Sequence, residues 1–125
     1  MEDAKLETPI PMEEMVPIFA KRHVMITNDL EGGNVLKIKC KSKDNDLGIH
    51  YLTFHNTFQW EFRDKFLSDT RFYCYMWWGK NVTETFDVYI AVRDAPNCTA
   101  CKWSIRTDGA YWFNPDTKSW DIMYR

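Results

Sequence analysis

Short stretches in which apolar and polar residues alternate are the feature that most constrains the fold of this chain. In residues 35–41 the side chains of Leu36, Ile38 and Cys40 alternate with lysines, and residues 58–63 repeat the pattern with aromatic side chains. Alternation with a period of two places every second side chain on one face of a β-strand. Aromatic residues make up 16% of the chain and concentrate in such stretches, which favours sheets over helices. The chain is therefore predicted to be all-β, and Cys40 is predicted to face the core.

Nine segments of this kind are predicted to be strands, because residues typical of turns separate them. The predicted strands are residues 23–28, 35–41, 49–54, 58–63, 71–77, 85–92, 102–106, 110–113 and 118–123. The third and fourth are expected to form a hairpin around His55-Asn56-Thr57. Eight or nine short strands at this spacing predict an antiparallel β-sandwich, with a closed barrel as the alternative.

The charge distribution separates the start of the chain from the rest. Residues 1–20 carry five acidic residues against Lys5 and contain three of the five prolines, so we expect a flexible acidic tail. Residues 21–125 then form a single domain of ordinary size. Their charge is nearly balanced, so no nucleic-acid partner is expected. The sequence has no run of about 18 apolar residues, and no membrane span is expected.

Three motifs that suggest enzymes or metal sites have simpler interpretations. The segment Asp44-Asn45-Asp46-Leu47-Gly48 resembles a calcium loop, but Ile49 and His55 stand where an EF-hand needs Gly and Glu. It is predicted to be a turn. His50 and His55 are predicted to lie on opposite faces of a strand, and no nucleophile or phosphate-binding motif accompanies them. We therefore predict no catalytic residue, no metal ligand and no cofactor.

The four cysteines Cys40, Cys74, Cys98 and Cys101 are predicted to form disulfides. A zinc ribbon needs two close cysteine pairs, and here only Cys98 and Cys101 are close. A redox motif would need a helix after its first thiol, whereas the residues from Trp103 onward are predicted to be a strand. The sequence leaves three pairings open. We prefer the nested arrangement that joins Cys40 to Cys101 and Cys74 to Cys98.

Lysines and tryptophans offer candidate binding surfaces. A stripe of alternating lysines is interpreted as protection of a sheet edge, with contact to an acidic partner such as demethylated pectin or anionic lipid as the alternative; it comprises Lys37, Lys39, Lys41 and Lys43. Trp60, Trp77 and Trp103 are expected in the core. The other three tryptophans would favour carbohydrate binding if they formed an exposed line; they are Trp78, Trp112 and Trp120.

The order and spacing of several motifs resemble the plant self-incompatibility S-protein homologues. The resemblance extends from about Val24 to the C-terminus, and its motifs are residues 40–48, 58–62, 70–77, 86–89 and 98–103. Members of this family are small secreted β-proteins, and the founding type is a pistil ligand that arrests self pollen. The resemblance implies a disulfide-stabilised, extracellular, monomeric signalling ligand for a cell-surface receptor, and not an enzyme. The sequence begins without an apolar signal segment, so the resemblance implies that the signal peptide has been removed.

Recognition by such a ligand is expected in loops, because loops vary without disturbing the core. The candidate loops are Asp29–Asn34, Gly79–Glu84, and the residues Arg93, Asp94, Ala95, Pro96 and Asn97. Two N-glycosylation sequons fall in predicted loops, at Asn81 and Asn97. The alternative function is a carbohydrate- or cell-wall-binding module with an acidic cell-wall polysaccharide as its partner.

The cysteine pattern predicts that all four thiols are oxidised. The intact mass should rise by about four protons on reduction, two for each disulfide. Mass spectrometry of the folded protein before and after reduction measures this difference. Free thiols in folded protein would contradict the prediction.

Overall fold

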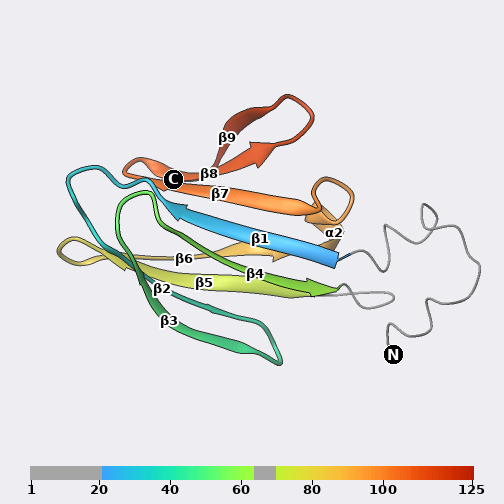
Figure 1. Ribbon diagram of the computed structural model, residues 1–125, viewed down its shortest axis with the longest axis horizontal. Helices are drawn as coiled ribbons and strands as arrows, with labels where there is room; N and C mark the ends of the chain where they lie inside the picture. Colours follow the sequence, from blue (N-terminus) through green and yellow to red (C-terminus); the bar gives the residue numbers. More distant parts are fainter. Residues whose placement is uncertain (1–20, 64–69) are drawn as a thin grey trace, which may run out of the picture.

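Two β-sheets packed face to face make up the part of the chain that the computed structural model describes, residues 21–63 and 70–125 (Figure 1). In chain order the strands there are β1 (Lys21–Asn28), β2 (Leu36–Lys41), β3 (Asp46–Leu52), β4 (Thr57–Arg63), β5 (Arg71–Trp78), β6 (Val82–Ile90), β7 (Ala100–Arg106), β8 (Gly109–Asn114) and β9 (Ser119–Tyr124). One short helix, α2 (Ala91–Asp94), follows β6. The β-sandwich predicted from the sequence is confirmed, whereas the predicted tail of residues 1–20 lies outside the described residues.

The strands divide into a five-stranded sheet A, in the order β4-β1-β7-β8-β9, and a four-stranded sheet B, in the order β3-β2-β5-β6. Strands β1 and β7 run parallel, and the other neighbouring pairs among the described residues are antiparallel. A sheet with one parallel pair is common when distant segments meet at its centre.

The prediction of a hairpin around His55 is wrong, because β3 and β4 belong to different sheets. Strand β3 pairs with β2, and β4 pairs with β1. The turn between them is fixed by the end of β1: His55 N donates to Asn28 O at 2.6 Å, and Asn28 N donates to Asn56 O at 3.0 Å. Residues 53–56 therefore carry the chain from one sheet to the other.

The core lies between the sheets and contains the alternating apolar side chains of the central strands. Val24 and Ile26 of sheet A and Leu36, Ile38 and Met76 of sheet B are fully buried. Trp103 is 1% exposed, as predicted, and its Nε1 donates to Val88 O of the opposite sheet at 2.9 Å.

Phe58, Trp60 and Phe62 lie on one face of β4, as predicted, and are half-buried against this core. The strand predicted to reach residue 92 ends instead at Ile90, because Asp94 Oδ2 accepts a hydrogen bond from Ile90 N at 2.8 Å and helix α2 begins.

The nested disulfide pairing predicted from the sequence is wrong. Cys40 is joined to Cys74, and Cys98 is joined to Cys101. Cys40 and Cys74 are direct partners in the register of β2 and β5, and both point into the core. Their α-carbons lie 4.0 Å apart. The register of sheet B therefore selects this pairing, which links two strands of one sheet.

The two disulfides should contribute unequally to stability. The Cys40–Cys74 bond spans 34 positions of sequence, whereas the Cys98–Cys101 bond spans three. Loop-closure entropy gives about 4 kcal/mol for the longer loop and about 2 kcal/mol for the shorter one. Replacing Cys40 and Cys74 together by alanine should therefore lower the free energy of unfolding in urea more than replacing Cys98 and Cys101. If replacing Cys40 and Cys74 lowered the free energy of unfolding by the same amount or less, the Cys40–Cys74 bond would not be the larger contributor to stability.

Candidate functional site

Two of the three predicted recognition loops lie together at one end of the sandwich. The loop Asp29–Asn34 joins β1 to β2, and the turn Gly79–Asn81 joins β5 to β6 (Figure 1). The loop predicted over Gly79–Glu84 is shorter than expected, because β6 already begins at Val82. Asn34 Oδ1 lies 3.6 Å from the position that a β-carbon would take on Gly79. The segment Arg93–Asn97 lies at the opposite end (Figure 1). The three predicted loops therefore form two separate surfaces.

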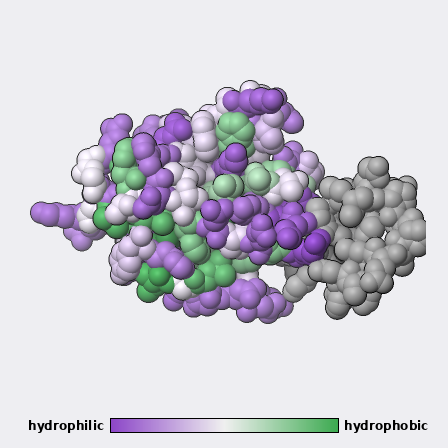
Figure 2. Space-filling view, in the orientation of Figure 1, coloured by the Kyte–Doolittle hydropathy of each residue, from purple (hydrophilic) through white to green (hydrophobic). Residues whose placement is uncertain are grey.

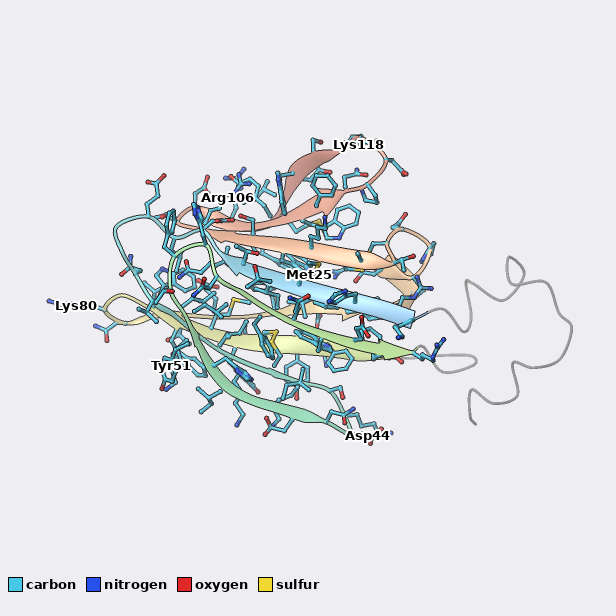
Figure 3. The ribbon with its side chains drawn as sticks, in the orientation of Figure 1. Met25, Asp44, Tyr51, Lys80, Arg106 and Lys118 are labelled. Atoms are coloured by element: carbon cyan, nitrogen blue, oxygen red, sulfur yellow. A yellow bond between two sulfur atoms is a disulfide. The ribbon has the colours of Figure 1, made fainter. Side chains whose placement is uncertain are left out.

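The base of the Asp29–Asn34 loop is held firmly. Asp29 N donates to Ile105 O at 2.9 Å, its carboxylate accepts a hydrogen bond from Ser104 Oγ, and Asp29 Oδ1 lies 3.5 Å from His55 Nε2. The tip is exposed and includes Glu31, and the two following glycines take positive φ of 83° and 73°. Lys80 projects from the neighbouring turn (Figure 3). A rigid base with an exposed charged tip suits recognition by a partner.

The structure corrects the prediction that Arg93 and Asp94 form part of an exposed loop. Asp94 is 3% exposed, and its carboxylate accepts hydrogen bonds from Arg93 Nε at 2.8 Å and from Ile90 N. Arg93 also donates to Tyr124 Oη at 2.8 Å. Burial acts to lower the pKa of Arg93, but the bonds to Asp94 and Tyr124 raise it overall. This pair joins α2 to β9 and is structural.

The rest of that segment is more open. Pro96 and Asn97 are exposed, Ala95 is half-buried, and all three line a shallow depression of about 580 Å³. Of the two sequons, Asn81 stands exposed in a turn, whereas Asn97 donates its side-chain amide to Arg93 O at 2.6 Å. Asn81 is therefore the more accessible glycosylation candidate.

His50 and His55, the two histidines considered as catalytic candidates, have separate structural partners. The ring of His50 stacks on Phe58 with 4.0 Å between centroids, and its Nε2 lies 2.8 Å from Leu47 O. His55 lies beside Asp29, as described above. Across residues 21–63 and 70–125, no group of three or more His, Cys, Asp or Glu side chains is placed to hold a metal ion.

The turn predicted over Asp44–Gly48 forms only at Asp44 and Asn45, because β3 already begins at Asp46. Ser42 N donates to Asn45 O at 2.8 Å, and Asp46 Oδ1 accepts from Gly48 N at 2.9 Å. The Gly48 hydrogen bond, with Lys39 and Lys41 nearby, lowers the pKa of Asp46. Gly48 takes a φ of 82°, which glycine adopts without strain.

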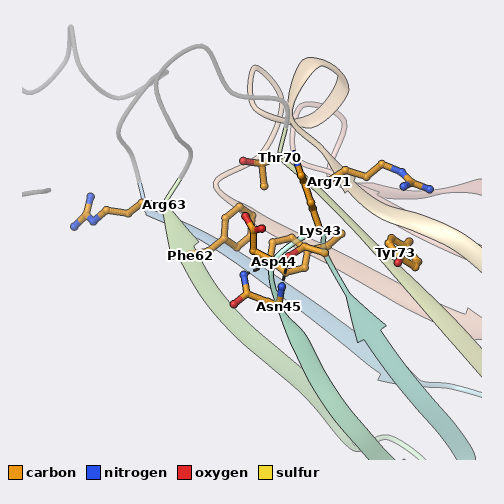
Figure 4. A pocket seen from close by; sticks show the side chains of 10 residues that line it. Lys43, Asp44, Asn45, Phe62, Arg63, Thr70, Arg71 and Tyr73 are labelled. Atoms are coloured by element: carbon orange, nitrogen blue, oxygen red, sulfur yellow. Dashed lines mark hydrogen bonds between the residues drawn. The ribbon is translucent and has the colours of Figure 1, made fainter. Parts of the chain in front are cut away.

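A depression of about 350 Å³ lies beside this turn (Figure 4). Lys43, Asp44 and Asn45 line one side of it, and Phe62 and Arg71 line another. Arg71 Nε lies 2.6 Å from Asp87 Oδ1, so its charge is already paired. The guanidinium of Arg71 is therefore not free to bind a ligand in this depression.

The predicted lysine stripe lies on a central strand. Lys37, Lys39 and Lys41 project from the outer face of β2, which has β3 on one side and β5 on the other, so the interpretation as edge protection is wrong. Lys43 lies in the following turn and is separate from this row.

Trp77 was predicted to lie in the core, and this prediction is wrong. The side chain lies on the outer face of β5. Phe72, Cys74 and Met76 are buried there, so Tyr73, Tyr75 and Trp77 point outward. The sequence could have predicted this orientation. Trp77 is three positions from the inward-facing Cys74, and residues an odd number of positions apart lie on opposite faces of a strand. The three tyrosines of this face, Tyr51, Tyr73 and Tyr75, were not predicted as surface candidates.

The other tryptophans do not form an exposed line. Trp78 and Trp112 are half-buried against the core. Trp120 is 38% exposed and lies beside Phe113 and Arg106 on the outer face of sheet A.

Comparisons with known proteins agree on one family. The family model described as plant self-incompatibility protein S1 matches residues 23–125. S-protein homolog 29 of Arabidopsis thaliana is 40% identical over 106 residues, which cover 85% of this chain and 78% of that protein. Self-incompatibility protein S1 of Papaver rhoeas is 36% identical over 108 residues, which cover 85% of this chain and 78% of that protein.

A solved structure shares the fold. It represents SPH (self-incompatibility protein homologue) proteins, described as a widespread family of small, highly stable, secreted proteins from plants. The TM-score is 0.59 at 22% identity, over 84% of this chain and 90% of that one. Among the helices of the described residues, none has the length and apolar character needed to cross a membrane.

The buried Arg93–Asp94 pair generates a stability prediction. Asp94→Ala should lower the free energy of unfolding by about 2–4 kcal/mol, because it leaves the partly buried guanidinium of Arg93 without its carboxylate and the backbone amide of Ile90 without its acceptor. Val92→Ala is the matched control, since Val92 is 85% exposed and should change stability by less than about 0.5 kcal/mol. Urea unfolding measures both. Equal stability of the two variants would show that Asp94 does not stabilise the fold.

Proposed function

This chain belongs to the plant self-incompatibility protein S1 family, and we propose that it acts as a secreted, monomeric signalling ligand that a plant cell-surface receptor recognises. The resemblance predicted from its motifs is thereby confirmed. Secretion is supported by the related solved structure, which represents secreted plant proteins. Two disulfides also suit an oxidising compartment.

The observation that carries the proposed recognition mode is the pairing of the Asp29–Asn34 loop with the turn at Gly79–Asn81. Both connect strands of the sandwich at the same end, and both expose charged residues, Glu31 and Lys80. The bonds of Asp29 to Ser104 and Ile105 fix one loop to sheet A. A receptor therefore meets a surface whose backbone is already ordered, which reduces the entropy lost on binding.

The Arg93–Asn97 segment contributes less to this proposal. Arg93 and Asp94 are committed to the internal network, which leaves Pro96 and Asn97 as the exposed residues of that segment. No catalytic step is proposed, since His50 and His55 each have a separate structural partner.

The proposal is tested by removing the charges of the loop end. The double variant Glu31→Ala, Lys80→Ala should bind plant surface membranes at least about tenfold more weakly, the size expected when central contacts of an interface are lost. Its free energy of unfolding should change by less than about 0.5 kcal/mol, because both side chains are exposed. Pull-down with tagged protein and thermal unfolding measure the two effects.

A matched control removes one acid and one lysine at the other end of the molecule. Asp116→Ala with Lys118→Ala changes the exposed turn between β8 and β9 and leaves the net charge equal to that of the loop variant. It should bind membranes like the unmodified protein. Equal binding by both double variants would remove the loop end from the recognition site.

A further inference from the structure

The outer face of sheet B carries rows of aromatic side chains and lysines that the core does not need. Strand β2 contributes Lys37, Lys39 and Lys41, and β5 contributes Tyr73, Tyr75 and Trp77 beside them. The register pairs Lys37 with Trp77, Lys39 with Tyr75 and Lys41 with Tyr73. Each lysine therefore stands next to one ring, across neighbouring strands of an ordered sheet.

Strand β3 extends this face on the other side of the lysines. Tyr51 is paired with Lys37 and is 66% exposed, and Ile49 is paired with Lys39 and is 49% exposed. Figure 3 places Tyr51 at the periphery of the molecule beside β3. Figure 2 shows hydrophobic patches among hydrophilic side chains on the side of the molecule turned toward the viewer. We call the eight residues of these three strands the aromatic–lysine face.

The rings of β5 form a continuous row. The centroids of Tyr73 and Tyr75 lie 5.8 Å apart, and those of Tyr75 and Trp77 lie 6.2 Å apart with an interplanar angle of 22°. Lys37 Nζ lies 4.9 Å from the centroid of the Trp77 ring. The row holds flat apolar surfaces and positive charges at fixed spacing, because both come from adjacent strands about 4.8 Å apart.

Part of the positive charge on this face is unpaired. Lys39 Nζ lies 3.6 Å from Asp46, whereas Lys37 and Lys41 have no carboxylate within 4 Å in the described part of the chain. Alternate residues of a strand are about 6.6–6.8 Å apart, so Lys37 and Lys41 are separated by about 13 Å. These two ammonium groups are therefore available to an extended ligand with repeated negative charge.

We propose that the aromatic–lysine face binds an acidic polysaccharide, a chain of uronate sugars. Such a chain has a carboxylate on each sugar for the lysines and apolar ring faces that pack on planar side chains, as other flat groups do. The density of charge argues against nucleic acid, because Asp46 and Asp87 lie along the same sheet and the chain has a net charge of −2. A lipid surface would need several protruding apolar side chains. On this face Ile49 is the one exposed aliphatic side chain, and the rings of Tyr73, Tyr75 and Trp77 are half-buried. This inference is separate from recognition at the loop end.

The direct test is titration of the folded full chain with demethylated polygalacturonate at low and moderate salt. The unmodified protein should bind, and the double variant Lys37→Gln, Lys41→Gln should bind at least tenfold more weakly with a smaller dependence on salt. Lys21→Gln with Lys102→Gln removes the same charge from sheet A and should bind like the unmodified protein. Absence of binding, or equal weakening by both double variants, would overturn the proposal.

Two further arms separate charge from stacking and polysaccharide from lipid. Tyr51→Ala, at a highly exposed position, should weaken binding severalfold and leave the salt dependence unchanged. Fully methyl-esterified polygalacturonate should bind at least tenfold more weakly than the acid form. Equal binding of the neutral polymer would overturn the role of the lysines. Binding to phosphatidylserine vesicles without binding to polygalacturonate would overturn the proposal in favour of a lipid surface.

The glycan and receptor tests are distinguishable. Glu31→Ala with Lys80→Ala should bind polygalacturonate like the unmodified protein, because neither residue belongs to the aromatic–lysine face. Loss of polygalacturonate binding in that variant would overturn the assignment to sheet B.

Discussion

The buried side chain of Asn28 holds together the point at which the chain passes twice between the sheets. Its Nδ2 donates to Asn34 O at 2.9 Å and to Leu52 O at 2.7 Å, and its Oδ1 accepts from Leu30 N at 2.8 Å. Asn28 is fully buried, and its hydrogen bonds with Leu52 O and Leu30 N are buried, so these two groups would lack water if the amide were absent. An unsatisfied buried polar group costs about 1–3 kcal/mol, and two such groups depend on this side chain. The conformation of the proposed recognition loop Asp29–Asn34 therefore depends on Asn28.

The covalent and apolar contributions to stability act at different places. The Cys40–Cys74 bond links two strands of sheet B. The Cys98–Cys101 bond joins the segment before β7 to the start of that strand. Neither joins sheet A to sheet B. The two sheets are held together by the apolar core and by contacts such as Trp103 Nε1 to Val88 O. The disulfides thus stabilise the fold by restricting the unfolded chain, and burial of apolar surface remains the force that joins the sheets.

Local periodicity predicted what each strand is, but not which strand it pairs with. The alternation around Cys40 correctly placed that residue inward, and nine strands were found near their predicted positions. The turn at His55 has the local composition of a hairpin, yet hydrogen bonds to the distant Asn28 make it a crossing between sheets. The predicted cysteine pairing is wrong for the same reason, since the true pairing depends on the register of β2 with β5. Of the candidate site, the loop at Asp29–Asn34 was predictable from its turn residues, whereas the burial of Asp94 depends on β6 and α2.

The aromatic–lysine face and the loop end are continuous, and this links the two proposed partners. Trp77 is two residues from Gly79, and Lys37 is three residues from Asn34. A polysaccharide lying along β2 and β5 therefore ends beside the loops proposed for the receptor. The aromatic–lysine face supplies no side chain to the buried core, and in the loop end only Leu30 does so. The exposed residues of both surfaces can therefore change without loss of the fold. The sandwich thus separates stability, which depends on its inner faces, from two adjoining outer surfaces on which partners can meet.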